Sequence, residues 1–157
     1  MDRGFSLVEL LVAMVIFAIG MLGLASLQGH SLQYNTDAYE RSQAVFFAYD
    51  MSDRMRANIA GVNANFYQNL TSAAPPPAAS CVAVTPVCDN ATMADADATE
   101  WFAEIATALP GGGGSVICQD SDAGADADAC TDGSMHRITV TWTGKWGAQS
   151  LQVDVLP

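Results

Sequence analysis

The chain begins with a nearly uninterrupted apolar segment. No charged residue occurs from Leu10 to Gln28, and leucine, valine, isoleucine, methionine and phenylalanine dominate this stretch. Its length is close to the ~20 residues that an α-helix needs to cross the hydrocarbon core of a bilayer. The sequence therefore predicts a membrane-spanning helix over residues 5–28.

The helical pattern continues beyond the apolar run. Apolar residues recur at near-helical spacing among polar partners, and no proline occurs before Pro75. Asp50 and Arg54 are four positions apart, which places opposite charges side by side on a helix. One helix from Phe5 to Asn58 would be about 80 Å long. The rest of the chain is too small to cover it, so we expect its first half to contact lipid or other subunits.

The pattern changes again after residue 70. Residues 71–80 have the composition of a linker. Asp97 and Glu100 precede an amphipathic stretch that includes Trp101 and Leu109, which predicts a capped helix ended by a glycine run. Residues 115–118 are a strand candidate.

Strict alternation follows near the C-terminus. Ile138, Val140 and Trp142 alternate with threonines, and a second alternating run covers residues 151–155. Two such runs around a glycine-containing turn predict a β-hairpin. The expected fold class is α+β: a long N-terminal helix, its first half transmembrane, followed by a small domain with a short helix and an antiparallel sheet.

Charge sets an orientation and limits the function. Arg3 precedes the apolar run and the next basic residue is Arg41, so the positive-inside rule leaves the N-terminus in the cytoplasm and exports the rest. The net charge of −11 argues against a nucleic-acid partner, which requires a basic surface. No phosphate-binding loop or hydrolase motif occurs, so we expect no enzyme activity and no cofactor.

Four cysteines lie in the predicted exported part: Cys81, Cys88, Cys118 and Cys130. An even number there predicts two disulfides. A zinc site is the alternative, but the spacings match no common zinc pattern and neither histidine is near in sequence. The sequence allows three pairings. We expect nearest neighbours to pair, 81 with 88 and 118 with 130.

An acidic loop lies between the last two cysteines. Its aspartates include Asp120, Asp122, Asp126 and Asp128, and such dense oxygen ligands offer a calcium site as an alternative. Their spacing does not match an EF-hand. The preferred interpretation is a solvated acidic loop without a metal.

The acid inside the apolar run needs its own explanation. A secretory signal peptide would be shorter and free of Glu9, and a plain anchor helix leaves that costly charge without a partner. Near the membrane interface the carboxylate would instead reach water.

Met1-Asp2-Arg3-Gly4 followed by Phe5-Ser6-Leu7-Val8-Glu9 resembles the class III signal of type IV prepilins. The resemblance implies that a prepilin peptidase cuts after Gly4, removes residues 1–4 as a leader and N-methylates Phe5. It also implies that Glu9 meets the N-terminal amine of a neighbouring subunit. Two buried opposite charges are tolerated only as a pair, which fits this arrangement.

Further segments resemble the PilV family of type IV pilus modification proteins, which are minor pilins. They are Ser42-Gln43-Ala44, Ala48-Tyr49-Asp50-Met51 and Asp53-Arg54-Met55-Arg56-Ala57-Asn58. Major pilins usually carry a proline near mature position 22, where this chain has Ser26.

The PilV resemblance implies a minor pilin that helps to initiate type IV pilus assembly. Its expected partners are prepilin peptidase, other minor pilins and the major pilin, first in the inner membrane and then in the pilus. A type II secretion pseudopilin and a tip adhesin or ligand-binding pilin are the alternatives. The implied organisation has a transmembrane and assembly helix at 5–28, its periplasmic continuation at 29–70, and a disulfide-containing domain at 71–157.

Candidate subunit contacts are the charged residues of the continuing helix, Asp50, Asp53, Arg54 and Arg56. The alternative is that they form an exposed helical face with an internal ion pair.

Overall fold

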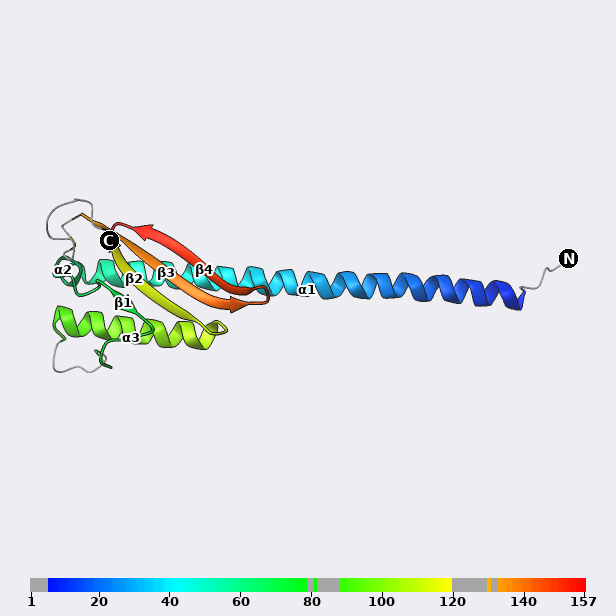
Figure 1. Cartoon of the computed structure of the whole chain (residues 1–157), viewed down its shortest axis with the longest axis horizontal. Helices are drawn as coiled ribbons and strands as arrows, with labels where there is room; N and C mark the ends of the chain where they lie inside the picture. Colours follow the sequence, from blue (N-terminus) through cyan, green and yellow to red (C-terminus); the bar gives the residue numbers. More distant parts are fainter. Residues whose placement is uncertain (1–5, 79–80, 82–87, 120–129, 131–132) are drawn as a thin grey trace. The chain divides into compact units, whose positions relative to one another are not determined.

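The computed structural model describes residues 6–78, 81, 88–119, 130 and 133–157. In chain order the elements are α1 (Leu7–Ala57), α2 (Ile59–Asn63), β1 (Leu70–Thr71), α3 (Asn90–Ala108), β2 (Gly113–Gln119), β3 (Met135–Gly144) and β4 (Gly147–Val155) (Figure 1). The chain divides into two units, an N-terminal unit Met1–Tyr39 and a C-terminal unit Glu40–Pro157, and α1 contributes to both.

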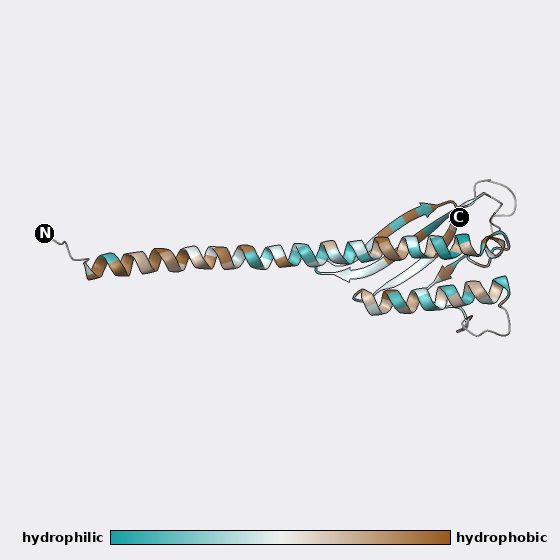
Figure 2. Ribbon diagram, turned by 180° about the vertical axis from the view of Figure 1, so that it is seen from behind, coloured by the Kyte–Doolittle hydropathy of each residue, from teal (hydrophilic) through white to brown (hydrophobic). Residues whose placement is uncertain are grey.

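The N-terminal unit consists of the first part of α1. Its large apolar side chains are exposed within the chain: Phe17 is 68% and Leu22 is 72% exposed. Figure 2 shows the beginning of α1 mainly in the colour of hydrophobic residues and the turns that follow largely in hydrophilic colours. By length and composition, α1 can cross a membrane. The predicted apolar helix is therefore confirmed.

The C-terminal unit contains a four-stranded antiparallel sheet in the order β1-β2-β3-β4. Its register aligns one apolar residue from each strand in a single row, Leu70, Val116, Ile138 and Val153. Side chains in such a row lie on the same face because strand side chains alternate. The predicted hairpin is β3 and β4, and Ile138, Val140 and Trp142 are buried as their alternation predicts.

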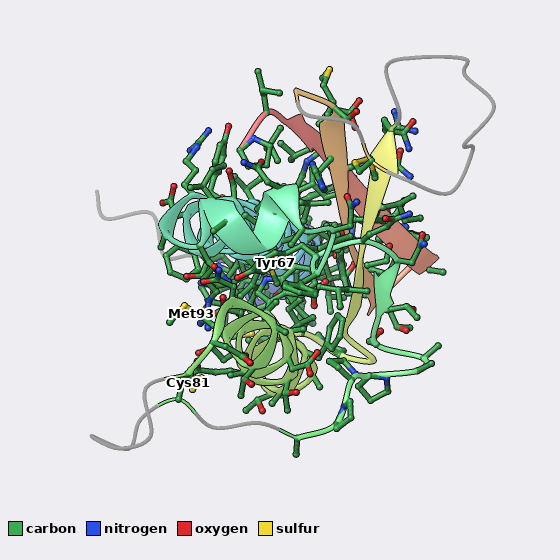
Figure 3. All side chains as sticks on the ribbon, turned by 90° about the vertical axis from the view of Figure 1, so that its left-hand side faces the viewer. Tyr67, Cys81 and Met93 are labelled. Carbon is green, nitrogen blue, oxygen red and sulfur yellow. A yellow bond between two sulfur atoms is a disulfide. The ribbon has the colours of Figure 1, made fainter. Side chains whose placement is uncertain are left out.

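Two helices cover this inner face of the sheet. The last part of α1 and the whole of α3 lie on the same side of the strands, as Figures 1 and 3 both show. Met51 and Met55 of α1 and Trp101 of α3 have no exposed surface, and the Trp101 indole N–H donates a 2.8 Å hydrogen bond to the Phe47 carbonyl. This bond joins the two helices inside the core.

Close packing of α3 on β2 depends on a glycine. A Cβ at Gly114 would lie 2.5 Å from two carbons of the Trp101 ring, and 3.2 Å from Ile105 Cδ1. Real Cβ contacts are essentially never that short, so only glycine at this position lets the Trp101 ring approach the strand this closely. The three tryptophans differ sharply in exposure: Trp101 is buried, Trp142 is 6% exposed, and Trp146 at the β3–β4 turn is 74% exposed.

The structure corrects the boundary predicted at residue 71. Helix α1 ends at Ala57, next to the Asn58 end expected from the helical pattern, whereas the implied continuation of the helix ran to residue 70. Asn58 caps α2 by accepting a hydrogen bond from the Gly61 N–H. Leu70 and Thr71 form an edge strand, because their backbone groups pair with β2. The C-terminal unit begins at Glu40, and the residues of α1 that follow Glu40 supply much of its core.

The helix predicted around Trp101 is longer than expected. It begins at Asn90, and its N-cap is Asp89, whose carboxylate accepts a 2.8 Å hydrogen bond from the Thr92 N–H. Asp97 lies inside the helix instead of at its start. The alanine-rich segment before Asp97 favours helix without showing a clear apolar face.

Candidate functional site

The N-terminal motif reaches the described part of the chain at Glu9. Gly4 and Phe5, the expected cleavage and methylation site, lie outside the described residues. Glu9 lies in the first turn of α1, and its N–H donates a 3.0 Å bond to the Ser6 carbonyl. A carboxylate suits a helix N-terminus because the helix dipole is positive there. It is the only charged residue from Leu7 to Gln28.

The expected contact residues of α1 separate into two pairs with different surroundings. Arg54 is only 19% exposed, and its guanidinium donates to Asp50 and Glu100, both at 2.8 Å, and to Glu104 at 3.4 Å. Because both glutamates belong to α3, Arg54 links the two helices of the C-terminal unit. These acidic neighbours raise the pKa of Arg54 despite its partial burial, so it stays charged.

The second pair is a surface pair. Asp53 is 75% exposed and Arg56 is 53% exposed, and they are joined at 3.2 Å three positions apart on α1. Exposed pairs of this kind contribute at most about 1 kcal/mol to stability. Asp53 and Arg56 are therefore available to another molecule, whereas Arg54 is occupied within its own chain.

A groove runs between α1 and α3 beside Arg54. Its volume is about 620 Å³. Phe46 lines it and is 62% exposed, while Asp50, Glu100 and Glu104 give one wall a negative charge. An exposed aromatic side chain beside acidic groups is chemically suited to a partner with apolar and basic side chains.

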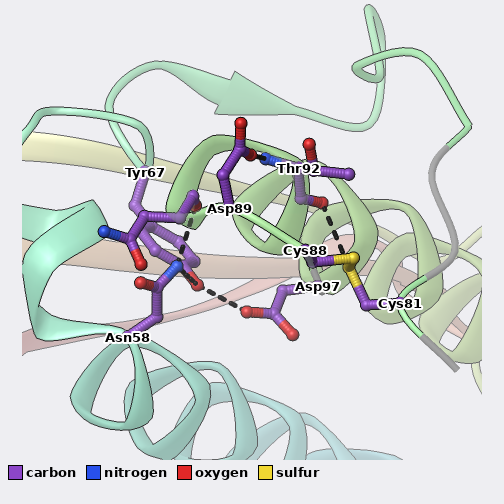
Figure 4. The surroundings of a disulfide bond; sticks show 8 residues. Asn58, Tyr67, Cys81, Cys88, Asp89, Thr92 and Asp97 are labelled. Atoms are coloured by element: carbon purple, nitrogen blue, oxygen red, sulfur yellow. Dashed lines mark hydrogen bonds between the residues drawn. A yellow bond between two sulfur atoms is a disulfide. The ribbon is translucent and has the colours of Figure 1, made fainter. Parts of the chain in front are cut away.

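A buried polar network lies at the other end of α3. The Tyr67 hydroxyl donates a 2.5 Å hydrogen bond to Asp97 and accepts one of 3.2 Å from the Asn58 side-chain N–H (Figure 4). Tyr67 has no exposed surface and lies between α3 and the end of α1 and α2 (Figure 3). Burial raises the pKa of Tyr67, and the hydrogen bond to Asp97 raises it further. Burial also raises the pKa of Asp97, although Tyr67 and Arg54 both act to lower it.

The first disulfide is next to this network. Cys81 pairs with Cys88, and their Cα atoms are 5.8 Å apart. Cys88 directly precedes Asp89, the N-cap of α3, and Cys81 Sγ lies 3.7 Å from the Thr92 carbonyl oxygen (Figure 4). In Figure 3, Cys81 and Met93 lie on the side of α3 that faces away from the sheet. The disulfide therefore ties the incoming chain to the first turn of α3.

The second disulfide joins Cys118 to Cys130, so both pairings are those expected from the sequence. The sequence did not indicate that His136 lies beside it, with Nε2 3.7 Å from Cys130 Sγ. His136 is 3% exposed, and burial lowers the pKa of its imidazole. Asp120, Asp122, Asp126 and Asp128, the calcium alternative, lie outside the described residues.

Several partners at these sites are far apart in the sequence and meet only in the folded chain. Glu100 and Glu104 are 46 and 50 positions from Arg54, and Tyr67 is 30 positions from Asp97. Two signals could have indicated His136: it is six positions from Cys130, and the pairing of residues 113–119 with residues 135–144 sets Cys118 opposite it.

Comparison with known proteins identifies two families. Residues 1–25 match the prokaryotic N-terminal methylation motif, and residues 26–99 match the Tt1218-like family, described as type IV pilin Tt1218. No curated protein and no solved structure matches the chain. The two matches adjoin at residue 25, within α1. The chain is therefore a type IV pilin-like protein with a prepilin-type N-terminal methylation motif.

Proposed function

We propose that this pilin is a minor pilin that takes part in the initiation of type IV pilus assembly, within a priming or tip complex with other minor pilins. The observation that carries the proposal is the apolar run of α1 from Leu7 to Gln28, which exposes apolar side chains and includes one acid, Glu9. A charge in the hydrocarbon core of a membrane costs a few kcal/mol, and an opposite charge on a neighbouring subunit offsets that cost. The N-terminal amine of a neighbouring pilin, freed by cleavage after Gly4, is the partner that we propose.

The same proposal assigns a route through the cell. Prepilin peptidase removes residues 1–4 on the cytoplasmic side and methylates Phe5. The apolar part of α1 holds the protein in the inner membrane, with the C-terminal unit in the periplasm, before the helix enters the filament. Ser26 in place of the usual proline of major pilins supports a minor role, and so do the segments from Ser42 to Asn58 that resemble PilV.

Two variants test processing and assembly separately. Gly4→Leu should leave the precursor uncut, and intact-mass measurement of the membrane-extracted protein would show it. A methylated chain beginning at Phe5 in that variant would contradict the cleavage site. Glu9→Gln keeps the shape of the side chain and removes only its charge. It should therefore be cut and methylated normally, but it should lower the number of surface pili because the pairing with the neighbouring N-terminal amine is lost.

Asp37→Asn is the matched control, since it removes an acid from the same helix beyond the apolar run. Normal piliation with Glu9→Gln would refute the charge pairing. A deletion strain then decides among the roles. Loss of pili with normal protein secretion supports the minor pilin, the reverse result supports a type II secretion pseudopilin, and normal pili that no longer attach support an adhesin.

A further inference from the structure

Two strands and one disulfide bring three metal-binding side chains together. Cys118 of β2 is directly opposite His136 of β3 in the sheet register, and Cys118 is bonded to Cys130. Within the described part of the chain, the two sulfur atoms and a ring nitrogen of His136 all lie within 4.8 Å of one another. The imidazole is held in place because His136 is almost fully buried.

The separations fit a tetrahedral soft-metal site. Zinc binds thiolate sulfur at about 2.3 Å and imidazole nitrogen at about 2.0 Å, so two such ligands at a tetrahedral angle are roughly 3.5 Å apart. The distance from Cys130 Sγ to His136 Nε2 is 3.7 Å. The two sulfur atoms would have to separate, and the 6.0 Å between the Cα atoms of Cys118 and Cys130 leaves room for this by side-chain rotation. Cys118 Sγ already lies within 4.8 Å of the ring nitrogen of His136.

The site also has space for a fourth ligand. A cavity of about 40 Å³ borders Cys130 and His136 and is lined further by Ser134 and Pro157. One water molecule needs roughly 10–15 Å³ of such volume. Zinc sites with three protein ligands commonly complete their coordination with one water molecule.

We propose that Cys118, Cys130 and His136 form a redox-dependent site for Zn²⁺, which binds when the Cys118–Cys130 disulfide is reduced. A dithiol reductant supplies two electrons and two protons to the disulfide and is itself oxidised to a disulfide. The resulting two thiols lose two protons as their thiolates bind the ion. Oxidation reverses both steps and releases the metal. The site is independent of the pilin role proposed above.

Cobalt(II) is the spectroscopic probe, because thiolate ligands give it a charge-transfer band and tetrahedral geometry gives it intense visible bands. The reduced, detergent-solubilised full chain should show both with one Co²⁺ bound, and Zn²⁺ should displace it. The oxidised chain should show neither. Absence of the charge-transfer band from the reduced wild-type chain would overturn the proposal.

Variants of the same chain assign the ligands. Cys81→Ser/Cys88→Ser removes the other disulfide and should keep the spectrum, whereas Cys118→Ser/Cys130→Ser should abolish it; the opposite pattern would disprove the site. His136→Ala should weaken Zn²⁺ binding at least about tenfold, by comparison with the effect of changing outer-shell groups. His30→Ala, at the other histidine, is the control and should bind as wild type does. Wild-type affinity in His136→Ala would exclude the imidazole as a ligand.

Discussion

The Tyr67 hydroxyl offers a sharp test of how the C-terminal unit is held together. Tyr67→Phe removes one oxygen atom from a fully buried ring, so it leaves no apolar cavity. It deletes the hydrogen bond to Asp97 and leaves the Asn58 side chain with its remaining 2.9 Å bond to the Asn90 carbonyl. A hydrogen bond to a charged group contributes about 1.5–3 kcal/mol.

We therefore expect Tyr67→Phe to lower the free energy of unfolding by about 2 kcal/mol at neutral pH, nearer the middle of that range because the Asp97 side chain is 19% exposed. For a unit of this size, the loss corresponds to a fall in Tm of roughly 10 °C. The assay is thermal unfolding of the full chain in detergent, followed by near-ultraviolet circular dichroism. Tyr49→Phe is the control, because Tyr49 is 56% exposed on α1.

The stability loss in Tyr67→Phe should also depend on pH in a definite direction. The pKa of Asp97 in the folded chain is above its ordinary value of 3.8, so the contribution of this carboxyl to stability declines as the pH rises through its folded pKa. Tyr67 acts to lower that pKa, so Tyr67→Phe should raise it and steepen the decline. The difference between variant and wild type should grow from pH 4 to pH 7. A difference that does not change with pH, or a loss no larger than that of Tyr49→Phe, would refute this reasoning.

Two further substitutions test the packing and the ion pairs. Gly114→Ala should cost about 1–3 kcal/mol, because its Cβ meets the rigid Trp101 ring at 2.5 Å; urea unfolding followed by fluorescence measures this, and a neutral result would contradict the close packing. Arg54→Met should cost about 2 kcal/mol because it leaves Glu100 and its acidic neighbours without their shared cation, whereas Arg56→Met should stay within about 0.5 kcal/mol. Equal losses in the two arginine variants by the same assay would show that Arg54 does not link α1 to α3.

Local periodicity accounts for what the sequence predicted correctly. The apolar run at the start of α1 and the alternation in β3 are patterns of neighbouring residues, so they can be recognised without knowledge of the fold. The same reasoning placed the Asp50–Arg54 pair, which the structure has at 2.8 Å. It failed at β1, because a two-residue strand has no period of its own and forms only when β2 offers its edge.

The features that the sequence did not predict depend on contacts between residues far apart in the chain. Whether Arg54 is a surface charge or a link between helices depends on Glu100, which is 46 positions away and reaches it only after α3 has docked. His136 had no recognisable sequence partner, and strand register alone brings it to Cys118. Sequence spacing excluded common zinc patterns, but spacing along the chain does not limit which residues meet across a sheet.

The unequal exposure of the three tryptophans makes the chain its own optical reporter. Trp101 at the interface of α1, α3 and β2 and Trp142 on β3 are both buried, so a red shift in the buried emission would mark the opening of this core. Trp146 at the hairpin turn is open to soluble quenchers while the fold is intact. Loss of its quenching when other pilins are added, without a shift in the buried emission, would show that the tip of the β3–β4 hairpin becomes covered in the assembly. Intrinsic fluorescence of one unlabelled sample could thus report folding and assembly as separate events.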